Sequence, residues 1–147
     1  MQKFYTNITK LSEGIMNTAK GLYRFTKHYG INYNTGEIKG IELYEKFLQT
    51  FPKINFSFSF IGFHKYESLK KQEGLTAYGI SGTMLYALSK QKAYKYNLYQ
   101  CKEISGKKKL NGIRLSLVFE KETIKINLGF ADGNIVLAAL KQAGKKS

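Results

Sequence analysis

The chain has 147 residues, of which 43% are hydrophobic and 14% aromatic, enough to bury one core and too few for several large domains. Its 24 Lys and Arg residues outnumber its 10 Asp and Glu residues, and all of the basic residues except Arg24 and Arg114 are lysines. The net charge of +14 favours a polyanionic partner, nucleic acid before a membrane surface, although a basic and merely soluble protein would carry the same signal.

The N-terminal stretch, residues 1–20, lacks the apolar run of a signal peptide. Ile8, Leu11 and Ile15 are spaced as in a short amphipathic helix, and the stretch is predicted to be such a helix or an arm, ahead of a single domain over residues 21–147. Cys101 is the only cysteine, which excludes an intrachain disulfide, and no run reaches transmembrane length. We therefore expect a soluble, cytoplasmic protein.

The first half of the domain shows period-two alternation, which is typical of half-buried strands. Residues 21–47 are predicted as two strands around a turn at residues 34–36. Ile54–Phe60 is the clearest case: its Ile and Phe residues fall on one face and are predicted core, whereas Asn and Ser fall on the other.

Two segments of the second half read as helices and the others as strands. Ser81–Gln91 is predicted to be a helix with Ser81 as N-cap, and Asp132–Ala143 one with Asp132 as N-cap, ended by Gly144. The predicted strands and turns are Leu75–Gly79, Ala93–Lys102, a lysine-rich loop at Gly106–Lys109, and a hairpin of Ile113–Phe119 with Ile124–Leu128.

The two predicted helices resemble each other, and each follows a group of strands. Ser81-Gly82 matches Asp132-Gly133, and Lys90-Gln91 matches Lys141-Gln142. The pattern predicts a mainly β protein of the α+β class, with antiparallel strands, two short helices, and a strand-strand-strand-helix unit given twice. Chance similarity among β sequences of this biased composition explains the same matches equally well.

Residues for catalysis are scarce. His28 and His64 lie in different segments, and Cys101 has no Cys or His at metal-ligand spacing. Glu120 and Glu122 share a strand face, but a two-metal nuclease site needs further acidic ligands that this region lacks, so solvated charges near a turn explain them better. No phosphate-binding glycine loop is present. We expect no catalytic residue, no metal, no cofactor and no enzymatic activity.

Aromatic and basic residues alternate in two places, as they do in proteins that stack bases on rings and track phosphates with cations. One is Tyr23–Tyr29 and the other Lys92–Lys109, where the last three lysines would clamp phosphates. The predicted nucleic-acid-binding residues are Tyr23, Arg24, Phe25, Lys27, Tyr29, Lys39, Lys92, Tyr94, Lys95, Tyr96, Tyr99, Lys102, Lys107, Lys108, Lys109, Arg114 and Lys125.

The role of the second aromatic group has two interpretations. Tyr94 and Tyr96 share a strand face with Leu98, so this face is either an exposed stacking platform or part of the core, with Tyr99 alone exposed. The dominance of lysine over arginine favours phosphate neutralisation over reading of base edges, and hence weak sequence specificity.

Duplicated strand-helix units in a basic protein resemble the Whirly and transcriptional-coactivator type of single-stranded DNA-binding proteins, over about Leu22–Gln142. The stretch Ile38-Lys39-Gly40-Ile41 resembles a Lys-Gly-containing motif of plant Whirly proteins only in its Lys-Gly pair, so no functional residue is carried over from the family. An OB-fold barrel with an extra C-terminal helix is the alternative fold, with a helix at Ser81–Gln91.

Both folds imply the same function. The sequence predicts a non-sequence-specific single-stranded DNA-binding protein that uses lysines on phosphates and Tyr or Phe rings on bases, with self-association along the strand and no membrane contact. Two alternatives stay open. One is a structural protein of a phage or plasmid that binds duplex DNA or RNA, and the other is a basic membrane-surface or protein-interaction module that acts through its N-terminal segment.

Overall fold

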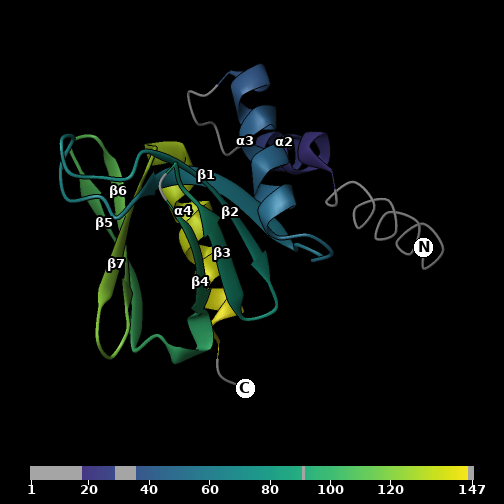
Figure 1. The fold of residues 1–147 in the computed structure, drawn as a ribbon. Helices are drawn as coiled ribbons and strands as arrows, with labels where there is room; N and C mark the ends of the chain where they lie inside the picture. The colour runs from purple at the N-terminus through teal and green to yellow at the C-terminus, as the bar shows by residue number, and fades with distance from the viewer. Residues whose placement is uncertain (1–17, 29–35, 91, 146–147) are drawn as a thin grey trace, which may run out of the picture.

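The computed structural model describes residues 18–28, 36–90 and 92–145. Within these ranges, two α-helices come first, seven strands follow with a short 3-10 helix among them, and another α-helix comes last (Figure 1). The elements are α2 (Ala19–His28), α3 (Glu37–Thr50), β1 (Phe58–His64), β2 (Leu75–Ser81), β3 (Met84–Leu88), β4 (Ala93–Asn97), the 3-10 helix η1 (Leu98–Gln100), β5 (Glu103–Lys109), β6 (Gly112–Val118), β7 (Thr123–Leu128) and α4 (Phe130–Ala143).

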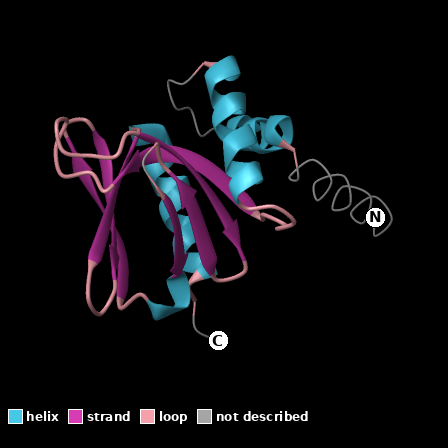
Figure 2. Ribbon diagram, in the orientation of Figure 1, coloured by secondary structure: helices cyan, strands magenta, loops and turns pink. Residues whose placement is uncertain are grey.

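The strands form one antiparallel sheet in the order β4-β3-β2-β1-β7-β6-β5. The sheet curves around α4, which packs against β5 and β6 on the inner face (Figures 1 and 2). On the outer face, α2 packs on β1 and α3 on β2 and β3. The predicted class, mainly antiparallel β within α+β, is confirmed.

Each face of the sheet has its own core. The inner core lies between the sheet and α4, and its buried residues include Phe60, Tyr78, Leu85, Tyr96, Leu115, Ile126, Val136 and Leu140. The outer core lies between the sheet and the two N-terminal helices and contains Leu22, Tyr23, Tyr44, Phe47, Phe51, Phe56, Ile61 and Ala77. The strands β1 to β3 are thus buried on both faces, whereas β5 to β7 are buried on one.

The prediction of two strands within residues 21–47 is wrong, because the described parts of this stretch belong to the helices α2 and α3. In α2, Leu22, Tyr23 and Thr26 are buried, which is helical rather than period-two spacing. The two helices touch closely: a Cβ on Gly40 would lie 2.6 Å from Cε1 of Tyr23. The segments predicted as N-terminal arm and as turn lie outside the described residues, apart from residues 18–20 and Gly36.

The predicted helix at Ser81–Gln91 is also wrong, and with it the repeated strand-helix unit. Described residues of this segment form the end of β2, a turn at Gly82 with φ of 61°, and β3. Leu85 faces the inner core, while the neighbouring Tyr86 packs against the outer core. Burial on both faces removes the polar alternation that marks a strand, so the apolar run resembled a helix.

The expected strand at residues 75–79, the hairpin and the last helix are confirmed as β2, as β6 with β7, and as α4. The helix α4 begins two residues before the predicted N-cap Asp132, with Gly129 at the N-cap, and Gly144 is its C-cap as predicted. Phe56 and Phe60 are buried as predicted, but not on one face of a strand: β1 begins only at Phe58, and Phe56 lies in the outer core and Phe60 in the inner core. Ser59, expected on a polar face, is fully buried beneath α2. No helix among the described residues is long and apolar enough to cross a bilayer.

A polar cluster that the sequence did not indicate interrupts the inner core. The His64 imidazole is fully buried between two tyrosines: Nδ1 lies 2.7 Å from the Tyr78 hydroxyl oxygen and Nε2 lies 2.8 Å from that of Tyr96. A neutral imidazole, with one donor and one acceptor nitrogen, satisfies both hydroxyls. Burial lowers the pKa of His64 from 6.5 to about 4, and the nearby Glu73 carboxylate opposes this only in part.

We expect His64 to make folding stability depend on pH. The pKa of His64 is lower in the folded state than in the unfolded state, so the contribution of neutral His64 to the free energy of unfolding is fully present above pH 6.5. This contribution falls as the pH drops toward 4, by roughly 3 kcal/mol in all. Urea unfolding at several pH values, compared with His64→Gln, measures this. The variant should be less stable at pH 7 and lose less stability between pH 6.5 and 5. Equal losses in both proteins would contradict the assignment.

Candidate nucleic-acid interface

The first predicted aromatic platform does not form. Tyr23 is only 8% exposed in the outer core, and Phe25 packs its ring edge-on against Phe58, with centroids 5.4 Å apart. Arg24 and Lys27 are exposed on α2, and Tyr29 lies outside the described residues. Tyr23, Arg24, Phe25 and Lys27 belong to the helix α2, so the alternation of a strand, which placed Tyr23, Phe25 and Lys27 on one face, does not apply to them.

In the second group, the structure favours packing over a stacking platform. Tyr96 is 7% exposed and is held by His64. Tyr94 stacks on Tyr96 with centroids 5.7 Å apart and donates a hydrogen bond of 2.5 Å to Glu73, and burial raises the pKa of both phenols. Tyr99 is 47% exposed and lies in η1, beyond the end of β4.

The predicted cations are spread over several surfaces. Lys39 is exposed on α3, and Lys92 precedes β4, with its ammonium 5.7 Å from the centre of the Tyr94 ring. Lys95 lies on the outward side of β4, and Lys102 precedes β5. The lysines at 107–109 were predicted in a loop but form the end of β5, an edge strand. Lysines on an edge also prevent edge-to-edge pairing, so this run alone does not indicate binding.

The outer face of β5 to β7 brings several cations together. In the strand register, Lys107 on β5 lies opposite Arg114 on β6. Lys125 on β7 lies opposite Ser116, which is two residues after Arg114 on β6. We call this surface the basic face; its outward residues are Glu103, Ser105, Lys107, Lys109, Arg114, Ser116, Val118, Thr123, Lys125 and Asn127. Glu103, at one end, is its only carboxylate. Arg114 and Lys125 lie on interior strands, so edge protection does not explain them.

The Arg114 side chain is held in place by its neighbours. Its guanidinium lies 4.4 Å from the centre of the Tyr66 ring, and its Nε donates a hydrogen bond of 3.1 Å to Oδ1 of Asn127. Tyr66 and Asn127 are almost fully buried, and Asn111 donates to the Tyr66 hydroxyl over 2.7 Å. Among the described residues, no carboxylate lies within ion-pair distance of Arg114. An oriented and unpaired guanidinium suits a phosphate oxygen.

The sequence analysis placed Arg114 and Lys125 correctly on outward positions but missed Tyr66, Asn111 and Asn127. Tyr66 follows β1 in the chain and reaches the basic face because its N–H donates to the carbonyl of Lys125. This contact joins segments far apart in the sequence, so local patterns carry no signal for it. Asn127 carried a weak one, as a polar residue between Ile126 and Leu128.

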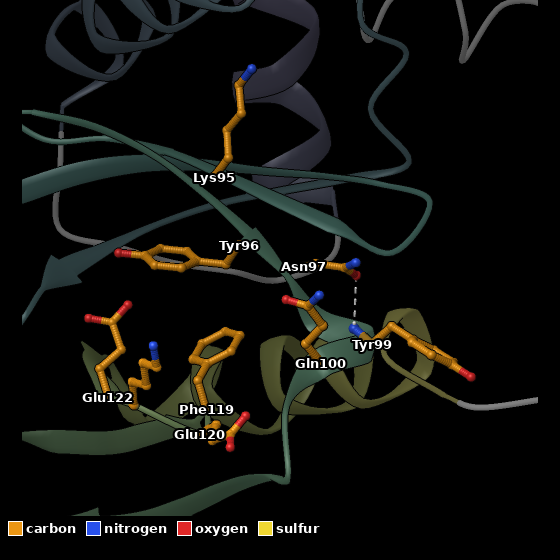
Figure 3. Close-up of a pocket in the computed structure, with 9 residues that line it drawn as sticks. Lys95, Tyr96, Asn97, Tyr99, Gln100, Phe119, Glu120 and Glu122 are labelled. Carbon is orange, nitrogen blue, oxygen red and sulfur yellow. Dashed lines mark hydrogen bonds between the residues drawn. The ribbon is translucent and has the colours of Figure 1, made fainter.

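Two acidic residues lie at the opposite end of β6 and β7. Glu120 and Glu122 lie in the turn between β6 and β7, beside a cleft of about 680 Å³ whose wall includes Tyr96 and Phe119 (Figure 3). The rings of Tyr96 and Phe119 face each other, whereas Tyr99 points away from them (Figure 3). No group of three or more potential metal ligands occurs among the described residues. Lys95 and Lys121 balance the charges of Glu120 and Glu122 around this cleft, so it carries no excess of positive charge to attract phosphates.

No protein-family model matches this sequence, and no curated protein shows significant similarity to it. Function must therefore be inferred from the geometry and charge of the chain itself. On the basic face several cations lie together, and one of them, Arg114, is held in a fixed orientation.

We expect Arg114 to contribute to stability as well as to charge. Arg114→Ala removes the contact with the Tyr66 ring and leaves Asn127 without its donor, which should lower the free energy of unfolding by about 1 to 2 kcal/mol. The free energy of unfolding of Arg114→Lys should lie between those of Arg114→Ala and the wild type. Urea denaturation measures the effect, with Lys125→Ala as control, for which we expect a change within about 0.5 kcal/mol. Equal stability of Arg114→Ala and the wild type would show that the contacts are not formed.

Proposed function

We propose that this protein binds nucleic acid without sequence specificity, with single-stranded DNA as its preferred ligand. The observation that supports this most is the basic face: four cations and one carboxylate on three strands, with a fixed arginine at the centre. An excess of cations on one surface attracts a polyanion, and the contacts of Arg114 with Tyr66 and Asn127 do not explain Lys107, Lys109 and Lys125 beside it. Lysines dominate it, as expected for contacts to phosphates rather than to bases.

The shape of the sheet favours a single strand over a duplex. The sheet curves around α4, so its outer face is convex (Figure 1). A stiff duplex touches a convex surface over a short length only, whereas a flexible single strand can follow the curve. This shape supports single-strand binding, the function that the Whirly and OB resemblances implied. Both folds were expected to have a helix at Ser81–Gln91, where the described residues form the end of β2, a turn and β3, so neither fold is proposed. The cytoplasmic setting and self-association along the strand stay proposals.

Base stacking requires a ring beside the basic face, and Phe63 provides one. Phe63 is half-buried on the outer side of β1 and is paired with Asn127, the residue that holds Arg114. Lys107, Arg114, Asn127 and Phe63 therefore form one row across four strands. At about 4.8 Å per strand, the row is about 14 Å long, room for a short stretch of single strand.

The charge contribution can be tested by anisotropy of labelled oligonucleotides over a salt series. The double variant Lys107→Gln/Lys125→Gln should bind single-stranded DNA more weakly, and the slope of log K against log salt should become shallower by about 1.4, about 0.7 per lost phosphate contact. Lys53→Gln/Lys141→Gln removes the same charge from other surfaces and should change little. Binding by the wild type that is no weaker at 200 mM than at 50 mM salt would overturn the proposal.

The stacking contribution has a separate test. Phe63→Leu keeps an apolar side chain but removes the ring, so single-strand affinity should fall, by about 1 kcal/mol or more, with an unchanged salt slope. Tyr99→Leu removes an exposed ring away from the row and serves as control. A loss in Tyr99→Leu alone would place the bases over η1 instead. A wild type that binds duplex and single strand equally would exclude stacking altogether.

A further inference from the structure

A second cationic surface lies on the other side of Phe63. Two adjoining hollows of about 500 and 410 Å³ run between α3 and the ends of β2 and β3, and both are lined by Lys39, Leu75 and Lys90. We call them together the lysine groove. Its cationic residues are Lys39, Lys46, Lys70 and Lys90, and its apolar ones include Phe63, Leu43, Leu69, Leu75 and Leu88.

The lysine groove carries an excess of positive charge. Its carboxylates are Glu42 and Glu73, and Glu73 already accepts hydrogen bonds from Tyr94 and Ser89. In the described part of the chain, none of the four lysines lies within 4 Å of a carboxylate. Four lysines around hollows that hold only two carboxylates leave an excess of positive charge, and an anion that enters the groove reduces the repulsion among them.

The lysine groove continues the row on the basic face. Phe63 lines one of the two hollows and is also the last residue of that row, next to Asn127 and Arg114. Cations thus lie on both sides of one ring, Lys107 and Arg114 on one side and Lys39, Lys70 and Lys90 on the other. Alternating cations and a ring along a path are the features that hold a single strand.

We propose that a bound single strand crosses the outer face of the sheet at right angles to the β-strands. It contacts Lys107 and Arg114, passes Phe63, and enters the lysine groove, where Lys39, Lys70 and Lys90 bind its phosphates. This inference rests on the proposed function and adds to it a direction and a second contact region. It also gives Lys39, which lies on a helix away from the basic face, a place along the same path.

The path predicts that the lysine groove matters only for long ligands. Oligo(dT) of about 5 nucleotides fits the basic face, and one of about 15 nucleotides reaches both regions. Lys39→Gln/Lys90→Gln should leave the affinity for the short oligonucleotide within about twofold of the wild type. For the long one it should lower affinity on the order of tenfold and reduce the salt slope by about 1.4.

Matched variants separate the outcomes. Lys53→Gln/Lys141→Gln carries the same charge change elsewhere, and thermal melting confirms that each variant folds. A wild type that binds neither oligonucleotide would refute the proposed function itself. Normal binding of both lengths by Lys39→Gln/Lys90→Gln would overturn the path but leave the function in place. Equal loss for both lengths would make the groove the primary site, which also overturns the path.

Discussion

The short pairing of β1 with β7 is the interaction on which the rest of the structure depends. It joins β1–β4 to β5–β7 through two residue pairs, Phe63 with Asn127 and His64 with Ile126. The first pair sets Phe63 beside the group that orients Arg114, and the second sets His64 within the inner core. A slip of one residue would exchange the two faces of β1 and place His64 outside.

The two halves of the sheet differ in what covers their outer sides. Apolar residues of β1 to β3 face α2 and α3, while β5 to β7 present Ser, Thr, Asn, Lys and Arg. The same curved sheet therefore provides a buried layer at one side and a polar surface at the other. The row from Lys107 to Phe63 runs across the boundary between them, which is why both the basic face and the lysine groove can contact one strand.

The sequence could predict elements that have one apolar and one polar face. Ile113, Leu115 and Leu117 alternate with Arg114 and Ser116, so the β6–β7 hairpin and the outward placement of Arg114 were found. In β3 the residues of both faces are apolar, one face buried and the other half-buried, so the polar alternation is lost and a helix was predicted instead. The support of Arg114 by Tyr66 depends on pairing between distant segments, which no local pattern encodes.

Two separate requirements can favour lysine on β5, namely phosphate binding and protection of the sheet edge. As an edge strand, β5 has main-chain groups that could pair with another chain, and its charged side chains keep such pairing from spreading. Replacement of these lysines by apolar residues would therefore promote aggregation even if binding were unaffected. Selection for solubility alone would preserve charge at positions 107–109, so conservation of lysine there across relatives would say less about ligand contact than conservation of Arg114.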